Sequence, residues 1–523
     1  MLPKETKSIC PKCKKPLPAI IFDKDGKVMI KKTCNKHGDF EDVYWSDVDM
    51  YLKAEEWAFD GDGVDNPKIT DAMDCPDSCG LCNLHSSHTC LALIDLTNRC
   101  NLNCKICFVN ANATGYVYEP SFKQVVEMMK ELKAEKPVPC SSIQFAGGEP
   151  SIHPQFFEII KKAKELDFAQ IQVATNGVEL RNFDFCQRMR DYGVHTVYLQ
   201  FDGFKEETYR KLRGKNLLKI KYKAIENCRN TKPTPLAVVL VPTICKTINN
   251  DEVGEIVNFA VKNFDVIRGV IFQPVSFTGR INKKKRMEQR YTLPDLVHDL
   301  KQQTDFLEKD DFYPVSSVVP ISKLHSSLTG KPKIALTVHQ HCGIATILFK
   351  ENDHVIPITR IIDVKGILSK LVEMEKSKRL HTLVEWRNKI RKKLPIGGRG
   401  IFGYLKMPYI KIFFSRWFIN TRKYQTIYNK LERFADEVFE EKGKGPLSRI
   451  FWDSLLIGGM HFQDSYNFDV ERVKRCGIHY ATLDGRIIPF CTYNSGPTYR
   501  EKIEKNFSIP LEEWKKKNGK VFF

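Results

Sequence analysis

The sequence predicts an α/β protein built on a partial parallel barrel of six β/α units, with metal-binding segments on both sides of it. Apolar strands alternate with amphipathic helices between residues 92 and 280, which favours parallel β/α units. Cysteine pairs flank a hairpin turn near the N-terminus, and single cysteines recur after residue 335. The predicted units are a ribbon-like metal domain (1–60), a cysteine-rich segment (61–91), the barrel (92–330) and a C-terminal domain (331–523).

Composition indicates a folded protein with more than one domain, because 523 residues exceed what one hydrophobic core organises. No apolar run reaches the length of a membrane-spanning helix, and the N-terminus MLPKETKSIC has no apolar signal core. We therefore expect a cytoplasmic protein. The net charge of +19 favours anionic partners, or reflects a Lys- and Glu-rich surface that serves stability at high temperature.

The 17 cysteines are the strongest compositional signal. Disulfides are rare in a reducing compartment, so short cysteine spacings indicate metal binding instead. Four cysteines stand alone among apolar or helical residues, and we expect them to be buried free thiols. They are Cys140, Cys186, Cys228 and Cys245.

The N-terminal segment 9–40 predicts a metal ribbon. Two short strands flank the turn Asp23–Gly26, whose Asp-Gly chemistry suits a hairpin. Cys10 and Cys13 precede this hairpin, whereas Cys34 and His37 follow it. Three thiolates and one imidazole form a ligand set for zinc or for a single, rubredoxin-like iron.

A second cysteine-rich stretch, CPDSCGLCNLHSSHTC, covers residues 75–90. Its spacing is too compressed for two knuckles around one zinc ion, and it favours an iron–sulfur cluster over zinc. The predicted ligands are Cys75, Cys79, Cys82 and Cys90. His85 and His88 are expected to shape the loop rather than to bind.

The barrel prediction depends on six apolar strands separated by helical stretches. The helices include 121–135 and 155–166, which carry apolar residues at helical spacing. Near-continuous apolar strands of this kind are typical of parallel sheets that are buried on both faces. The strands are LALIDLT, SIQFAGGEP, QIQVATN, TVYLQFDG, LAVVLVPT and GVIFQPVS.

The loop after the first of these strands carries Cys100, Cys104 and Cys107 in a C-x3-C-x2-C spacing. The C-terminal ends of barrel strands carry active sites. Three thiolates can hold three corners of a [4Fe–4S] cluster and leave one iron open to another ligand. The next strand ends in Gly147-Gly148-Glu149, where the glycines permit close approach of a ligand and the glutamate offers an acceptor for an amine.

The three-cysteine loop and the GGEP sequence, in this order on successive strands, resemble the radical S-adenosylmethionine (radical SAM) superfamily over residues 92–280. The resemblance implies a 5′-deoxyadenosyl radical generated from SAM bound to the open iron, with Gly147, Gly148 and Glu149 holding the methionine end. Asn176 and Asp202 end the third and fourth strands, where they would contact ribose and carboxylate, or would instead cap helices. Ile106 stands where the superfamily often has an aromatic residue against the adenine, and Phe108 is the substitute candidate.

Over nearly the whole chain, the order of motifs is similar to the archaeal tetraether lipid synthases, within a methylase-like group also assigned to dihydropterin methylation. The resemblance implies three [4Fe–4S] clusters and one mononuclear iron, or zinc, in the ribbon. The second auxiliary cluster would use Cys342, Cys476 and Cys491, completed by His341, by Cys245 or by a non-protein ligand.

This resemblance leads us to expect a lipid-coupling enzyme that joins the terminal carbons of phytanyl chains in archaeal diether lipids through an sp3–sp3 C–C bond. The expected partners are the diether lipid, an electron donor such as ferredoxin, and the membrane surface as a peripheral contact, without nucleic acid. The aromatic and basic stretch 394–423 would line an apolar channel or lie on the membrane, or form an ordinary core helix pair.

Two other functions remain open at this point. The first is a radical SAM methyltransferase acting on 7,8-dihydro-6-hydroxymethylpterin in methanopterin biosynthesis, which needs no long apolar cavity. The second is an RNA-modifying iron–sulfur protein, which the positive charge favours but which lacks a recognisable RNA-binding module.

Overall fold

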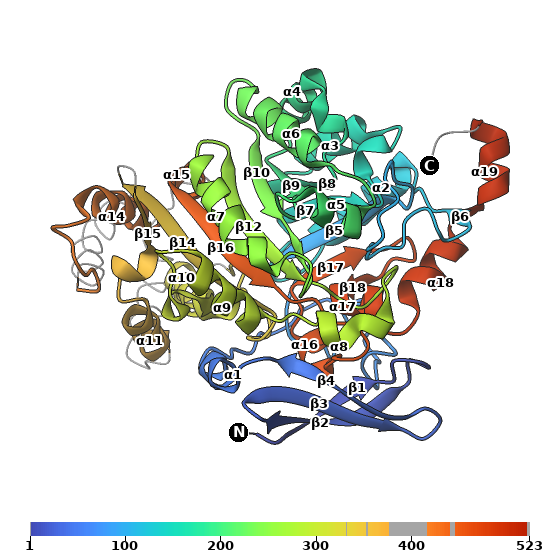
Figure 1. The fold of residues 1–523 in the computed structure, drawn as a ribbon, viewed down its shortest axis with the longest axis horizontal. Coiled ribbons are helices and arrows are strands. Elements are labelled where there is room, and N and C mark those ends of the chain that lie inside the picture. Colours follow the sequence, from blue (N-terminus) through green and yellow to red (C-terminus); the bar gives the residue numbers. More distant parts are fainter. Residues whose placement is uncertain (1, 331, 352–353, 376–415, 440–444, 520–523) are drawn as a thin grey trace, which may run out of the picture.

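The structure is a computed structural model, and it describes residues 2–330, 332–351, 354–375, 416–439 and 445–519. Strands form a four-stranded sheet near the N-terminus, a long central sheet and a short two-stranded pair (Figure 1). The strands are β1 (Lys4–Ile9), β2 (Pro16–Lys24), β3 (Lys27–Cys34), β4 (Gly38–Trp45), β5 (Leu91–Thr97), β6 (Tyr116–Val117), β7 (Ser142–Gly147), β8 (Gln170–Thr175), β9 (Thr196–Gln200), β10 (Ala237–Val241), β11 (Thr243–Ile244), β12 (Ile267–Pro274), β13 (Tyr313–Pro314), β14 (Gly343–Glu351), β15 (His354–Pro357), β16 (Ser454–Met460), β17 (Ile478–Ala481), β18 (Ile487–Pro489) and β19 (Ile509–Pro510).

Helices cover the outer side of the central sheet, and α2, α3, α6 and α7 each contact a barrel strand (Figure 1). The helices are α1 (Val48–Glu55), α2 (Phe122–Lys133), α3 (Phe156–Glu165), α4 (Phe183–Tyr192), α5 (Glu206–Arg213), α6 (Leu218–Asn230), α7 (Val253–Lys262), α8 (Arg286–Gln289), α9 (Leu293–Gln303), α10 (Val319–Thr329), α11 (Val364–Glu375), α14 (Gln425–Phe439), α15 (Gly445–Asp453), α16 (Val470–Lys474), α17 (Phe490–Ser495), α18 (Tyr499–Asn506) and α19 (Leu511–Asn518).

The predicted partial barrel is confirmed. Each of the six apolar runs contains one strand, and β5, β7, β8, β9, β10 and β12 pair in parallel in this order. Their apolar side chains, such as Ile143, Val173 and Leu240, are fully buried, which explains the near-continuous apolar runs. The four solitary cysteines are buried free thiols, as predicted.

Strands from the last third of the chain extend this sheet at both edges. β16 pairs in parallel with β12, and β17 pairs in parallel with β5, so that Ile478 lies opposite Leu91. β14 then continues beyond β16 and β18 beyond β17, both antiparallel. The sheet therefore crosses the predicted boundary at residue 330, and the domain limits themselves stay a prediction.

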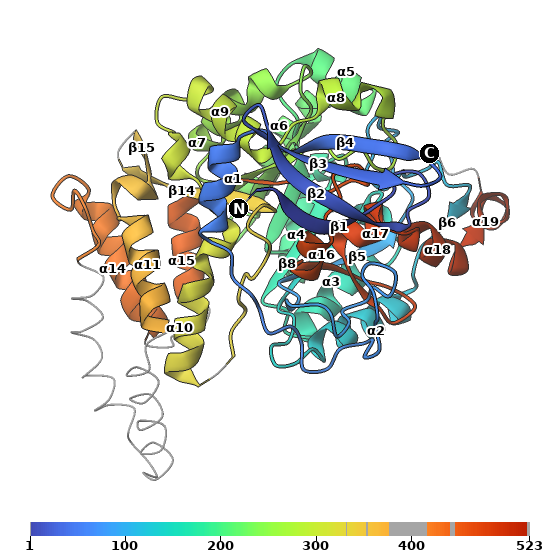
Figure 2. The same ribbon diagram turned by 90° about the horizontal axis from the view of Figure 1, so that it is seen from below.

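The N-terminal sheet is an antiparallel ribbon in the order β1-β2-β3-β4. Its predicted turn is formed by Asp23, whose carboxylate accepts a hydrogen bond from the Gly26 amide at 3.1 Å, while Gly26 adopts φ +75°. In Figures 1 and 2 the ribbon (dark blue) lies beside α16. The hydroxyl of Tyr44 donates to Asp469 at 2.8 Å and fixes this arrangement.

Candidate active site and metal centres

The three-cysteine loop lies at the C-terminal end of β5, and all three thiols line one cavity of about 280 Å³ at the mouth of the barrel. The amide of Cys100 donates to the Asn112 side chain at 2.9 Å, and this side chain returns a bond to the Cys100 carbonyl at 2.8 Å. Arg280 holds the part of the loop around Cys104, because its guanidinium donates a hydrogen bond to the Cys104 carbonyl at 2.7 Å. These hydrogen bonds fix the loop backbone.

The environment of these thiols suits metal thiolates. Burial raises the pKa of Cys100 and Cys104, so the metal-free thiols are protonated and binding a metal releases their protons. Backbone amides of Leu102 and Ala111 point at the sulfurs of Cys100 and Cys107, each at 3.4 Å. Among the described residues that line the cavity, no fourth cysteine accompanies the three. The loop thus fits a four-iron cluster with one iron open to a non-cysteine ligand.

The two glycines after β7 are required by the cysteine loop itself. The Gly148 amide donates to the Thr97 carbonyl at 2.7 Å. A Cβ atom on Gly147 would lie 2.3 Å from the Thr97 carbonyl oxygen, and one on Gly148 would lie 2.2 Å from that of Arg99. Gly147 also has φ +118°, which side chains rarely adopt. The glycines therefore let β7 approach the start of the loop while lining the cavity.

Gly148→Ala should consequently disturb the cavity, because the new methyl group overlaps a backbone oxygen that cannot rotate away. We expect a loss of about 1–3 kcal/mol in the free energy of unfolding, together with weakened SAM binding. Urea unfolding and equilibrium dialysis with SAM measure the two effects. The control is Gly26→Ala, which meets no atom within 4 Å and strains only a distant turn. Unchanged SAM affinity in Gly148→Ala would contradict the prediction.

Glu149 is fully buried and already bonded on both carboxylate oxygens. One oxygen accepts from the Thr175 hydroxyl at 2.8 Å and from the Ser151 hydroxyl at 2.5 Å, and the other accepts from the Asn176 amide at 2.8 Å. Burial raises the pKa of Glu149, and these hydrogen bonds lower it. In this geometry Glu149 ties the end of β7 to the end of β8.

Asn176 and Asp202 occupy different positions relative to the cavity. Asn176 lines it, with its side-chain amide 2.7 Å from the Asn101 side-chain oxygen and 3.7 Å from the Cys100 sulfur. Asp202 is buried behind the lining and forms two bonds of 2.7 Å with the Arg213 guanidinium. The group that reaches the cavity is Arg213, whose charge lowers the pKa of Cys104 against the effect of burial.

Phe108 and Ile106 both line the cavity, so each is placed to contact a ring bound there. The sequence reasoning missed several other lining residues, because single polar residues on strands, helices or loops carry no recognisable spacing. For the residues on strands, the alternation of side chains was the available signal. They include Gln144, Tyr198, Gln200, Arg213, Gln273 and Arg280.

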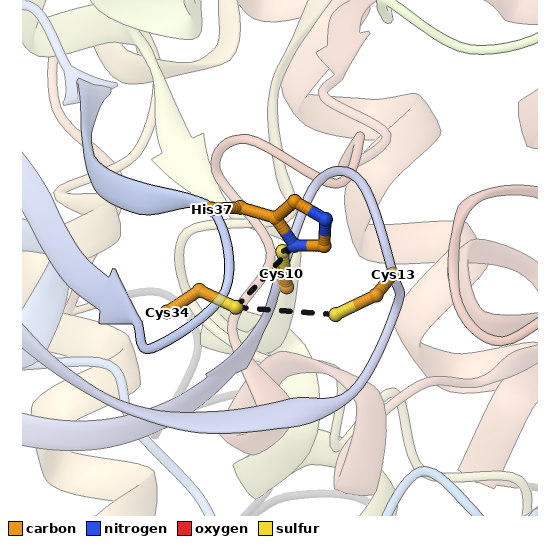
Figure 3. Close-up of side chains that lie close together, drawn as sticks. All are labelled: Cys10, Cys13, Cys34 and His37. Atoms are coloured by element: carbon orange, nitrogen blue, oxygen red, sulfur yellow. Dashed lines mark hydrogen bonds between the residues drawn. The ribbon is translucent and has the colours of Figure 1, made fainter.

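The ribbon holds a compact candidate metal site (Figure 3). Ligand atoms of Cys10, Cys13, Cys34 and His37 all lie within 4.8 Å of one another. The Nδ1 atom of His37 lies 3.4 Å from the Cys10 sulfur and 3.5 Å from that of Cys34. Three sulfurs and one imidazole nitrogen at this separation fit a single tetrahedral ion.

Cys13→Ser should remove this mononuclear metal. Three remaining ligands bind more weakly, and structural zinc contributes about 10–16 kcal/mol to the folding of zinc-finger peptides. We expect the metal content to fall by one equivalent and the ribbon to become susceptible to proteolysis, which mass spectrometry and limited digestion measure. Lys12→Ala, an exposed change in the same loop, is the control. Retention of the metal in Cys13→Ser would contradict the assignment.

In the 75–90 segment, three of the four cysteines lie near one another and Cys90 lies apart. Cys75, Cys79 and Cys82 interact electrostatically, and Cys476 from the C-terminal region adds to the raised pKa of Cys79. Cys90 lies apart: its sulfur faces the carbonyls of His88 and Ala335 at 3.7 and 3.6 Å, and its neighbouring thiol is Cys140. In the described part of the chain, no hydrogen bond or electrostatic interaction joins Cys90 to the other three thiols of this segment.

The three predicted ligands of the second auxiliary cluster lie near one another. Cys342 and Cys491 both raise the pKa of Cys476, and burial dominates the pKa of Cys491, raised to about 11. Neither of the suggested fourth ligands, His341 and Cys245, contacts these three cysteines in the described part of the chain. The His341 ring stacks on Tyr51 at 4.0 Å, whereas Cys245 packs against Leu212 and Phe277.

The parallel barrel and the three-cysteine loop define a radical SAM enzyme domain. The family model of the radical SAM superfamily matches residues 94–260, and a model of an HMPTM N-terminal zinc ribbon domain matches residues 2–46. The chain is 46% identical to the 7,8-dihydro-6-hydroxymethylpterin dimethyltransferase of Methanocaldococcus jannaschii over 98% of its own length and 97% of the relative. It therefore belongs to the family of that dimethyltransferase.

Other relatives match shorter parts of the chain. A GTP 3′,8-cyclase of Clostridium acetobutylicum is 27% identical over 37% of this chain and 59% of the cyclase. The crystal structure of Streptococcus suis SuiB bound to S-adenosylmethionine matches 42% of this chain and 48% of its own, with 17% identity and a TM-score of 0.33.

The full-length relative contradicts the predicted lipid-coupling function and the predicted lipid partner, because that protein is a methyltransferase of a pterin. The cavity also argues against the prediction: it is compact, and glutamines line it at several strands. Most of the aromatic stretch 394–423 lies outside the described residues, so its expected channel or membrane face has no structural counterpart here. None of the helices in the described ranges combines the length and apolar character that crossing a bilayer requires.

Proposed function

We propose that this chain is a radical SAM methyltransferase whose substrate is 7,8-dihydro-6-hydroxymethylpterin or a close derivative. The observation that carries the proposal is the similarity to the dimethyltransferase at 46% identity along almost the entire length of both chains. The agreement includes the ribbon, the barrel and the C-terminal strands, so it extends well beyond the part that binds SAM.

The chemistry of the cavity supports a small polar heterocycle. Gln144, Gln200 and Gln273 line it from three different strands. The side-chain oxygen of Gln144 is buried without a hydrogen-bond partner among the described residues, so it is available to an N–H donor of a ligand. A pterin and the guanine of GTP share a 2-amino-4-oxopyrimidine ring, and a GTP 3′,8-cyclase is similar to part of this chain.

In this proposal, Cys100, Cys104 and Cys107 hold a [4Fe–4S] cluster, which supplies the electron for reductive cleavage of SAM. Gly147, Gly148 and Asn176 accommodate the methionine end, and Glu149 keeps the strand ends that carry them together. Phe108 and Ile106 contact the adenine. Arg213 holds positive charge beside the cluster, and Asp202 orients it through the paired hydrogen bonds.

The remaining metal centres are proposals of the same kind. The ribbon ligands hold zinc or one iron. Cys75, Cys79 and Cys82 hold one auxiliary cluster. Cys342, Cys476 and Cys491 hold a second auxiliary cluster.

The test is a reaction of reconstituted enzyme with SAM, dithionite and 7,8-dihydro-6-hydroxymethylpterin under anaerobic conditions. We expect methylated pterin and 5′-deoxyadenosine, detected by mass spectrometry. Gln144→Met should raise the KM for the pterin about tenfold, because one hydrogen bond to the ring is lost. Gln170→Met, at the start of the neighbouring strand β8 and outside the cavity lining, is the matched control. Pterin recovered unchanged, while SAM is cleaved, would refute the proposal.

A further inference from the structure

His461 is a buried imidazole without a hydrogen-bond partner. Its side chain is 1% exposed, and neither ring nitrogen contacts a donor or acceptor among the described residues. Leaving a buried polar group unpaired costs about 1–3 kcal/mol, so a native protein retains one where something else binds it. Burial and the charge of Arg472 lower the pKa of His461 well below its usual value, and a neutral imidazole is the form that binds metals.

The strand register places His461 next to Cys342. Gly343 at the start of β14 pairs with Met460 at the end of β16, and the His461 amide donates to the Cys342 carbonyl at 2.9 Å. Directly opposite residues of an antiparallel pair point to the same face, with Cβ atoms about 4.5–5.5 Å apart. The side chains of His461 and Cys342 therefore point to the same face of the β14–β16 pair.

Cys491 approaches the same strand extension. The amide of Gln463, two residues after His461, donates to the Cys491 sulfur at 3.3 Å. The Gln463 side chain also bonds to this thiol. Phe462 stacks on Phe490 at 3.9 Å beside the barrel cavity, and Phe490 directly precedes Cys491. Cys342 and Cys491 therefore both lie against the segment that begins at His461.

A second observation indicates that this region holds negative charge. Arg472 is 1% exposed, and its guanidinium donates to the Cys342 sulfur at 3.3 Å. Among the described residues it forms no ion pair with a carboxylate, and its Nη1 atom is buried without a partner. An unpaired buried charge is strongly unfavourable, whereas an anionic metal–thiolate group beside it removes the penalty.

We propose that His461 is the fourth protein ligand of the auxiliary iron–sulfur cluster that Cys342, Cys476 and Cys491 hold. This inference depends on the proposed cluster at these three cysteines. Histidine takes the place of cysteine as a cluster ligand in Rieske centres, where it raises the reduction potential. Arg472 compensates the negative charge of the thiolates. A cluster with this ligand set accepts an electron more readily than an all-cysteine cluster in the same place.

The test measures nitrogen coordination directly by pulsed EPR. The starting protein is the full chain with Cys100, Cys104 and Cys107 replaced by alanine, reconstituted with iron and sulfide, with zinc in the ribbon and without SAM. These conditions exclude nitrogen signals from SAM and from His37. After dithionite reduction, we expect a strongly coupled 14N nucleus. His461→Ala should abolish it, and His461→Cys should retain the cluster without nitrogen coupling. His341 is another buried histidine near Arg472. His341→Ala should change neither the nitrogen coupling nor the retention of the cluster.

Persistence of the strong coupling in both His461 variants would overturn the assignment. So would its absence from the starting protein when the iron content is complete. A separate variant, Cys342→Ala, tests the underlying cluster: loss of about four irons supports it. Unchanged iron in Cys342→Ala would refute the auxiliary cluster itself, and with it the role of His461.

Discussion

Replacing Cys104 with alanine should abolish the reductive cleavage of SAM. The variant loses one of the three thiolates that can hold the cluster at the mouth of the barrel. Because Cys104 lies in a loop fixed by Arg280 and Asn112, no neighbouring side chain can move into its place without breaking those bonds. We expect about four fewer irons per chain and a decrease of about 10³-fold or more in 5′-deoxyadenosine, a change of ~4 kcal/mol in the activation barrier.

The matched control is Cys140→Ala, because Cys140 is a fully buried thiol outside the cavity lining that donates a hydrogen bond to the Ser142 carbonyl at 3.3 Å. It should retain its iron and its SAM cleavage at a small cost in stability. Iron content by chemical analysis and 5′-deoxyadenosine by chromatography distinguish the two variants. If Cys104→Ala cleaved SAM at the rate of the control, the three-cysteine loop would not be the site of reduction.

The second large effect is expected for Arg290→Met. Arg290 bonds to Asp42 of the ribbon at 2.9 Å and to Asp464 of the C-terminal region at 2.6 Å, and all three side chains are almost completely buried. Removing the cation leaves the Asp464 carboxylate buried without a positive partner, while Asp42 keeps Arg286 at 2.6 Å. We therefore expect a loss of about 3–5 kcal/mol in the free energy of unfolding. Urea titration followed by circular dichroism measures it.

The pH dependence of this loss has a defined sign. Arg290 holds the pKa of Asp464 below its usual value, against the effect of burial. The native protein therefore gains stability from this carboxylate above the unfolded-state pKa of about 4 and loses it as the pH falls further. In Arg290→Met the buried carboxylate prefers to be protonated, so the difference between the two proteins should narrow below about pH 4.

An exposed ion pair provides the comparison. Arg229 bonds to Asp265, whose side chain is 55% exposed, and Arg229→Met should cost less than about 1 kcal/mol. Equal effects of the Arg229 and Arg290 substitutions would show that the buried triad does not anchor the ribbon.

The sequence predicted those features that depend on neighbouring residues. The Asp23–Gly26 hairpin and the ribbon ligands follow from turn chemistry and short spacings, and the barrel strands from their apolar runs. Their agreement with the structure reflects local determinants of secondary structure.

Features that depend on distant pairing were not predictable in this way. β17 is four residues long, and only its pairing with β5 identifies it as part of the barrel sheet. The prediction grouped Cys90 with Cys75 because the two are near in sequence, and the proximity of Cys476 to Cys79 follows only from the fold. Arg213 and Gln144 are single polar residues whose role appears once the cavity is known.

The function illustrates a further limit. The cysteine loop and its glycines specify how SAM is held, but they make no contact that distinguishes a lipid from a pterin. In the proposed function, the substrate depends on cavity-lining residues such as Gln144 and Tyr198, which the cysteine motifs do not specify. A prediction of the substrate from the order of cysteine motifs was therefore open to the error that the full-length relative corrected.

The pairing of β17 with β5 also has a consequence for how the protein is made. The two strands join residues 91 and 478, and Asp469 is the partner of Tyr44 in the ribbon. During synthesis the ribosome therefore releases the ribbon and most of the barrel while one sheet edge is still bare and the docking face is absent. Exposed strand edges promote aggregation, and such long-range contacts form slowly. The nascent chain therefore exposes this sheet edge until the segment that carries Asp469 and β17 has been synthesised.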